Sequence, residues 1–397
     1  AYSATVYTLS TAYSNGVQQL LSGQPLPANS STEYTAGFND ANNGFDNALN
    51  GPNYPDTNAY GYVTSGAQQG LAVGQRALSG YNAAMQNNTT PTADSVQNDA
   101  NSGATAGYKD AISGSKQTDA QLAQTSLAYR KSYAKAYDDV KNAVLTGSTN
   151  FVRGQTPDKS NSQYSKIMEG YNYASQGFEY AKSHQSKDTT GLTDDQKNNS
   201  SYMRGFYAYV DAVIGYNDAQ NATSDTAPYN AAYKEQQRGY EGAIDGYRDG
   251  KNGTAQYTNN EVFPSSRVAY DLAYQDAKAK ATQGAIDAMS TNPTTDTSQF
   301  KAKQLDAYQT GKNNAVTGYN QAKSDLSVSN INPYTASTDS YDTFNGAHDG
   351  FVAGISGNGV IPSGSTSVYV AAYKKAQSEA SANVMNGVAD FAKNADD

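Results

Sequence analysis

The sequence predicts an all-α protein, built from tandem helical hairpins that stack as an α-solenoid or an elongated helical array. Three observations predict this fold. Tyrosines recur at helical spacing, one short sequence pattern of tyrosines and glycines, here called the phrase, recurs many times, and all 11 prolines fall between the predicted helices. A single hairpin would be unable to bury its aromatic face alone, so neighbouring units are expected to share a continuous core.

The helical spacing is clearest in PYNAAYKEQQRGYEGAIDGYRDG. One helix face is marked there by residues at intervals of four or three, namely Tyr229, Tyr233, Gln236, Tyr240, Ala243 and Tyr247. Gly239 and Gly246 lie beside this face, although a glycine inside a helix costs about 1 kcal/mol relative to alanine. A buried tyrosine covers about 150–250 Å², which outweighs that cost. The glycines are therefore expected to let a neighbouring helix approach the backbone; hinges are the alternative, but the regular spacing favours packing.

The same phrase predicts about twelve helices along the chain. They lie near residues 2–23, 33–50, 60–87, 93–114, 119–146, 160–184, 195–222, 229–250, 265–290, 298–326, 335–356 and 366–394. Corresponding starts two helices apart are separated by 65 to 73 residues, which indicates a hairpin as the repeating unit. The approximate units are 1–50, 60–114, 119–184, 195–250, 265–326 and 335–397, within one continuous repeat region over 1–397 that has no sharp domain boundary.

Composition excludes several classes of function. The net charge is -9 and no lysine or arginine cluster is present, so we expect no nucleic acid partner. The chain has no cysteine, which excludes disulfides and thiolate metal sites, and no run of 18 apolar residues, so we expect no membrane insertion. The first residues lack the features of a signal peptide, which indicates a mature or excised fragment.

The sequence offers no catalytic set. Only two histidines occur, His184 and His348, and neither has a second histidine nearby that would suggest a metal site or a triad. The adjacent aspartates at 138–139 and 194–195 cannot face each other across a cleft as glycosidase carboxylates do. We therefore predict no catalytic residues, no metal, no cofactor and no enzymatic activity.

Three tyrosines lie off the predicted core face of their helices: Tyr173, Tyr180 and Tyr207. An exposed tyrosine offers a rigid amphipathic contact that suits protein or sugar partners, so these three are the candidate ligand-binding residues. The alternative is structural, because a middle helix of a stacked array is buried on two sides and needs a second aromatic face.

The segments AYRKSYAKAYDDVKNAV, PYNAAYKEQQRGYEGAIDGYRDG and VYVAAYKKAQSEASANV carry the phrase most clearly. In these segments the chain resembles the tyrosine-rich helical repeats of large cell-surface adhesins of lactobacilli and related Gram-positive bacteria. The resemblance covers most of the chain. It implies a secreted protein attached to the cell wall, although the sequence contains no LPxTG sorting motif.

The resemblance implies a non-enzymatic extracellular adhesion module that binds a host mucosal or cell-surface glycan or protein. The alternative is a passive structural stalk that projects a separate binding domain. A cell-wall hydrolase is a third class, for which no catalytic residues are visible. Burial of the off-face tyrosines between helices would favour the stalk, whereas their clustering on an exposed face would favour adhesion.

Overall fold

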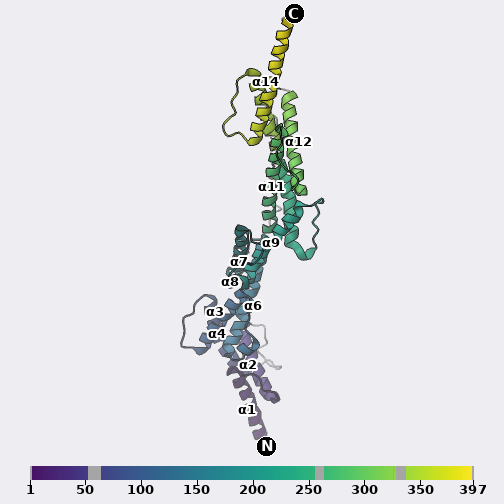
Figure 1. Ribbon diagram of the computed structural model, residues 1–397. Helices are drawn as coiled ribbons and strands as arrows, with labels where there is room; N and C mark the ends of the chain where they lie inside the picture. Colours follow the sequence, from purple (N-terminus) through teal and green to yellow (C-terminus); the bar gives the residue numbers. More distant parts are fainter. Residues whose placement is uncertain (1, 52–63, 255–262, 325, 328–336, 396–397) are drawn as a thin grey trace. The chain divides into compact units, whose positions relative to one another are not determined.

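The computed structural model describes residues 2–51, 64–254, 263–324, 326–327 and 337–395, and in these ranges it contains helices and loops only (Figure 1). The long helices are α1 (Tyr2–Leu21), α2 (Thr32–Asn50), α3 (Ser65–Met85), α4 (Ser95–Ser113), α6 (Leu127–Val152), α7 (Tyr164–His184), α9 (Ser200–Gln220), α10 (Lys234–Asn252), α11 (Pro264–Met289), α12 (Ala302–Ser324), α13 (Thr338–Ser356) and α14 (Ser367–Ala395). The short elements are α5 (Asp119–Leu122), α8 (Asp194–Asn198) and the 3₁₀ turn η1 (Ala231–Tyr233). The predicted all-α helical array is confirmed.

The chain packs as two compact units. Unit 1 contains Ala1–Phe151, Thr156–Glu179 and Thr189–Gly205, and unit 2 contains Val152–Gln155, Tyr180–Asp188 and Phe206–Asp397. Within each unit, helices that are neighbours in sequence form the main packing pairs. The absence of a sharp domain boundary stays a prediction.

Neighbouring helices run in the same direction. In unit 2, a Cβ atom added to three glycines of α10 would lie 2.2 to 2.4 Å from carbonyl oxygens of α11, in the pairs Gly242 with Ser266, Gly246 with Tyr270 and Gly250 with Tyr274. The members of each pair are 24 positions apart. A constant separation requires parallel helices, because between antiparallel helices the separation changes along the contact. Three pairs between α13 and α14 repeat the pattern at a separation of 23: Gly346 with Tyr369, Gly350 with Tyr373 and Gly354 with Gln377.

The predicted hairpins are therefore wrong, because a hairpin needs antiparallel neighbours. The repeating unit is one helix followed by a loop that returns alongside it, and two such units account for the spacing of 65 to 73 residues. The loop of residues 357–366, which precedes α14, shows how this works (Figure 1). Its 10 residues can span about 33 Å when extended, whereas the 19 residues of α13 rise by about 28 Å.

Each helix also begins farther along than the one before it. The starts of α10 and α11 are 30 positions apart and their contacting residues are 24 apart, so α11 begins six residues farther along the helix direction. The pairs α13–α14 and, in unit 1, α4–α6 give the same difference of six residues. Six residues of α-helix correspond to an axial step of about 9 Å.

In three helices, glycines on a single face pack against both the preceding and the next helix. In α10 the backbone at Gly239 lies against Ala212 of α9, whereas Gly246, seven residues later, lies against Tyr270 of α11. Two further helices, one in each unit, use the same spacing: α2 at Gly37 and Gly44, and α12 at Gly311 and Gly318. Seven residues are close to two helical turns, so both glycines share one face. The packing interpretation of the glycines is confirmed.

The tyrosine face of α10 is shorter than the sequence predicts. Tyr240, Ala243 and Tyr247 are buried, but Tyr229 lies in the preceding loop and Tyr233 is 52% exposed. The helix begins at Lys234 because the Asn230 side chain accepts a hydrogen bond from the amide of Ala232 and holds a 3₁₀ turn there. The predicted start at residue 229 is corrected to 234.

Candidate functional site

Tyrosine hydroxyls, most of them buried or half-buried, meet carboxylates on other helices, and these bonds are prominent polar interactions of the protein. A buried phenol needs a hydrogen-bond partner, and here it donates to an aspartate or glutamate. The pairs are Tyr13–Asp40 (2.6 Å), Tyr81–Asp139 (2.7 Å), Tyr133–Asp110 (2.8 Å), Tyr247–Asp276 (2.5 Å), Tyr270–Asp249 (3.0 Å), Tyr308–Asp287 (2.8 Å), Tyr319–Glu379 (2.6 Å), Tyr369–Asp349 (2.5 Å), Tyr108–Glu169 and Tyr229–Asp218.

These phenols hold their protons tightly. Burial, followed by the neighbouring carboxylate, raises the pKa of Tyr308 to about 12. Burial also raises the pKa of Tyr133 to about 12, and the pKa of Tyr247 rises further for the same reason. A phenol that stays protonated donates a hydrogen bond but is no general base near neutral pH. The arrangement therefore contributes to the stability of the fold.

The predicted ligand-binding tyrosines occupy different surroundings. In unit 1, Tyr173 is half-buried and lines a cavity of about 560 Å³ together with Tyr108, and burial followed by the Glu169 charge raises its pKa. In unit 2, Tyr180 is half-buried and stacks on His184, with 4.2 Å between the ring centroids. Tyr207, also in unit 2, is 49% exposed and meets Phe206 edge-on at 5.5 Å. Their role as ligand-binding residues stays a prediction.

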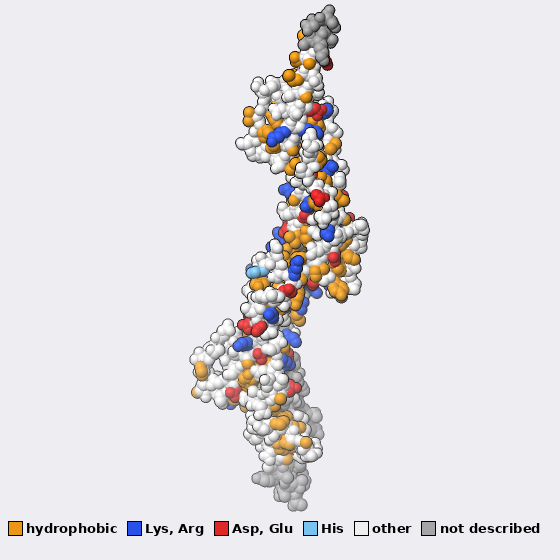
Figure 2. Space-filling view, viewed as in Figure 1, with side chains coloured by type: hydrophobic (Ala, Val, Ile, Leu, Met, Phe, Trp, Pro, Cys, Tyr) orange, Lys and Arg blue, Asp and Glu red, His pale blue; other side chains and the backbone are white. Residues whose placement is uncertain are grey.

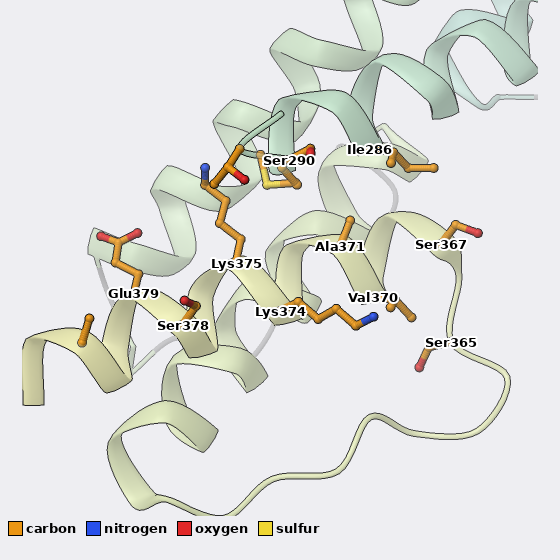
Figure 3. Close-up of a pocket in the computed structure, with 13 residues that line it drawn as sticks. Ile286, Ser290, Ser365, Ser367, Val370, Ala371, Lys374, Lys375, Ser378 and Glu379 are labelled. Atoms are coloured by element: carbon orange, nitrogen blue, oxygen red, sulfur yellow. The ribbon is translucent and has the colours of Figure 1, made fainter. Parts of the chain in front are cut away.

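Unit 2 also contains a groove of about 820 Å³ between the end of α11 and the outer side of α14 (Figure 3). Lys375 points from α14 toward the end of α11, and its ammonium nitrogen lies 5.4 Å from the ring centroid of Tyr319. Glu379 accepts hydrogen bonds from Tyr319 and Lys323, and the Lys323 bond is the main reason that its pKa is lowered. This groove was not predicted from the sequence, since α11 and α14 are far apart in the chain.

The chemistry of this groove is limited by its lining. Its side chains are serine, threonine, lysine, glutamate and aliphatic or methionine residues, with neither histidine nor cysteine among them. A serine nucleophile needs an adjacent base, and the carboxylate of Glu379 is already engaged by Lys323 and Tyr319. The groove can hold a polar chain by hydrogen bonds and charge.

A smaller cavity of about 230 Å³ in unit 2 contains two aspartates. Asp339 is only 9% exposed, and burial, followed by the charge of Asp342, raises its pKa to about 6. The Asp342 carboxylate accepts a hydrogen bond from Thr366 at 2.9 Å, and Lys278 lines the same cavity. Both aspartates project from the first turns of α13, so they do not face each other across a cleft.

The histidines make local contacts. A ring nitrogen of His184 lies 2.9 Å from the carbonyl oxygen of Tyr180, and one of His348 lies 3.1 Å from the Asp349 carboxylate. Over the residues that the structure describes, no group of three or more histidine, aspartate or glutamate side chains could hold a metal ion. Within the same ranges, every helix is too short or too polar to cross a lipid bilayer.

The surface is largely uncharged and polar. Figure 2 shows acidic and basic side chains interspersed over the visible face, without a large area of one sign. Such a surface gives no electrostatic reason to select a strongly charged partner. Comparison with known proteins adds no relative: no protein-family model matches the chain, and no curated protein or solved structure matches it.

Proposed function

We propose that the chain is a structural spacer of an extracellular cell-surface protein, which is the alternative to adhesion that the sequence leaves open. The axial step between successive helices carries this proposal. Because the later helix begins about 9 Å beyond the earlier one in the pairs α4–α6, α10–α11 and α13–α14, these repeats add length rather than width. The cell-surface setting rests on the resemblance to adhesin repeats.

Bonds between helices that are two steps apart support a spacer that resists bending. In unit 1, Tyr81 of α3 donates to Asp139 of α6 across the intervening α4. In unit 2, Tyr319 of α12 donates to Glu379 of α14, and Lys251 of α10 pairs with Asp306 of α12 at 2.7 Å. A bend between two neighbouring helices would have to break such a bond, so these ties favour a stiff array.

Adhesion remains a second candidate on two observations. Tyr207 keeps about half of its surface exposed, and the groove between α11 and α14 could hold a polar chain. In that case the chain would be a non-enzymatic module that binds a host or cell-surface glycan or protein. The buried phenols favour the spacer, because most of the aromatic surface is already used inside the protein.

A binding panel distinguishes the two functions. The full chain is applied to immobilised mucin, matrix proteins and a glycan array, together with Tyr207→Ala and Tyr173→Ala variants whose helical content is checked by circular dichroism. The spacer predicts no saturable binding to any of them. Saturable binding that is lost in one of the variants, while its helicity is kept, would replace the spacer by the adhesion module.

Small-angle X-ray scattering tests the observation on which the spacer rests. A variant that lacks residues 95–126, which are α4 and the loop after it, loses one repeat of unit 1. If helices are added end-wise, the maximum dimension falls by about 9 Å while circular dichroism shows a proportional loss of helix. An unchanged maximum dimension in a variant that remains folded would count against end-wise addition.

A further inference from the structure

The C-terminal half of α14 presents an apolar face that no described residue covers. Val384, Val388 and Phe391 are 41%, 60% and 75% exposed. A Cβ atom added to Gly387 would have no heavy atom within 4 Å, whereas every other helical glycine whose surroundings are described has an atom of another helix within that distance. Hydrophobic side chains are visible along this part of α14 in Figure 2, just before the grey end of the chain.

This face continues an interface that is already formed. Ala372, Ala376 and Ala380 are buried along α14. Ala380 packs on α13, since a Cβ atom added to Gly354 would lie 2.6 Å from its methyl carbon. Gly387 follows Ala380 by seven residues, close to two turns, so it lies on the same side of the helix. The interface therefore stops where α13 stops, not where the small and apolar residues of α14 stop.

The register of the other helices indicates what belongs on this face. In α11 the methyl group of Ala277 meets Gly250 of the preceding helix, and Gly284, seven residues later, meets Tyr308 of the next helix. In α4 the methyl group of Ala100 and the backbone of Gly107 show the same order. In α14, Ala380 meets the preceding helix, so Gly387 takes the position that meets the next one. From this register we infer that the face of α14 formed by Val384, Gly387, Val388 and Phe391, the late face, docks a further helix of the same repeat, parallel to α14.

The chemistry of the late face fits such a helix. Its four residues carry no charge, so recognition depends on shape and on burial of apolar surface. A glycine at its centre favours a partner that brings a backbone carbonyl into contact, and in this chain the carbonyls that meet glycines often belong to tyrosines, such as Tyr270, Tyr308 and Tyr373. The partner helix must carry small residues beside that carbonyl, as α14 does at Ala372 and Ala376.

The test supplies such a helix. The full chain is extended after Asp397 by a second copy of residues 357–395, the return loop and the helix that cover Gly346, Gly350 and Gly354 in the natural chain. Hydrogen exchange of the amides of residues 384–391 is measured in the natural and the extended chain, and the ratio of the two rates is compared. We expect exchange to be at least tenfold slower in the extended chain.

Two substitutions show whether the late face is responsible for the slower exchange. Each substitution is made in both the natural and the extended chain, and the ratio of the two exchange rates is measured again. With Gly387→Ala the ratio is expected to fall to about one, because the methyl group would meet the incoming backbone. Met385→Ala is the matched control: Met385 lies about 160° around the helix from Gly387, so its ratio should stay at least tenfold. A ratio near one in the unsubstituted pair, or an unchanged ratio with Gly387→Ala, overturns the inference.

Two other occupants would also be detected. Protection of residues 384–391 that rises with the concentration of the natural chain would identify a second copy as the occupant instead. Protection by phosphatidylcholine and phosphatidylglycerol vesicles, without any effect of the added helix, would identify a lipid surface. Either result overturns the proposed docking of a parallel repeat helix.

Discussion

The C-terminal halves of α13 and α14 have similar sequences and opposite surroundings. In α13, Gly350 lies against the carbonyl of Tyr373, and the neighbouring Phe351 is 6% exposed. In α14, Gly387 has no neighbour and Phe391 is 75% exposed. Glycine weakens both helices to the same extent, but only in α13 does a close neighbour offset that loss. The comparison shows that the glycines are useful to this fold only in pairs of helices.

The largest expected effect comes from filling a glycine that has a neighbour. In Gly350→Ala the new methyl carbon would lie 2.3 Å from the carbonyl oxygen of Tyr373 and 2.9 Å from its Cα atom, so the two backbones must separate. We expect the free energy of unfolding to fall by about 3 kcal/mol, the upper range for overpacked cores. Urea unfolding followed by circular dichroism measures the change.

Gly387→Ala is the matched control for this prediction. With no neighbour to displace, alanine should raise the stability of the helix, by at most about 1 kcal/mol. If the two substitutions change the free energy of unfolding by similar amounts, the contact between α13 and α14 is not what distinguishes the two glycines.

The next largest effect concerns the hydrogen bonds between tyrosines and carboxylates at interfaces between packed helices. Tyr308→Phe removes a hydrogen-bond donor from the buried carboxylate of Asp287. Burial raises the pKa of Asp287, but hydrogen bonds from Thr295, Tyr308 and Gln283 outweigh burial, so that its pKa is lowered overall. A hydrogen bond to a charged group contributes about 1.5–3 kcal/mol, so we expect a loss of about 2 kcal/mol. Tyr207→Phe, at an exposed tyrosine, should change stability by less than about 0.5 kcal/mol. Equal losses would mean that the carboxylate bond contributes nothing.

High pH should lower the free energy of unfolding, because it affects the buried tyrosines at the interfaces between helices. In the folded state the pKa values of Tyr133 and Tyr308 are raised to about 12, above the ordinary tyrosine value of 10.0. Between these values the folded chain holds protons that the unfolded chain has released, so the free energy of unfolding falls as pH rises above about 10. Urea unfolding at pH 8, 10 and 11 checks this, and Tyr308→Phe should show a shallower fall. A stability that stays constant to pH 11 contradicts the prediction.

Helix positions could be read from the sequence because the signals are local. Prolines end or precede helices, and a tyrosine at every third or fourth position marks one face, so the predicted and observed helices differ mainly at their ends. The glycine spacing was also sufficient to predict close packing. Both features depend on one helix at a time.

Helix direction was missed because the repeat spacing is the same for parallel and antiparallel neighbours. The loops contained the missing signal: helix pairs in bundles are usually joined by 2–8 residues, whereas 10 residues separate α13 from α14 and 12 separate α11 from α12. The partners of the buried phenols were missed for a related reason. Tyr81 and Asp139 are 58 positions apart, and only the register between α3 and α6 brings them together.

Removing the charge of a carboxylate that is buried without a hydrogen-bond donor should raise the free energy of unfolding, whereas removing a tyrosine bond should lower it. No described hydrogen bond reaches the side chain of Asp339, and burial raises its pKa to about 6 from the ordinary aspartate value of 3.8. The folded state therefore favours the protonated form, and its contribution to stability is present below about pH 4 and lost as pH rises through 6. At pH 8 the buried charge weakens the fold.

Asp339→Asn removes that charge and keeps the shape of the side chain. We expect the free energy of unfolding to rise by about 1 kcal/mol at pH 8, because the substitution removes a charge that is unfavourable in the folded state. The gain should disappear below about pH 4, where the aspartate is neutral in both states. Asp138→Asn, at an exposed position of α6, should show no such dependence on pH. A loss of stability in Asp339→Asn at pH 8 would mean that the carboxylate forms a favourable ion pair with Lys278, and that this part of the α13 interface resembles the tyrosine bonds after all.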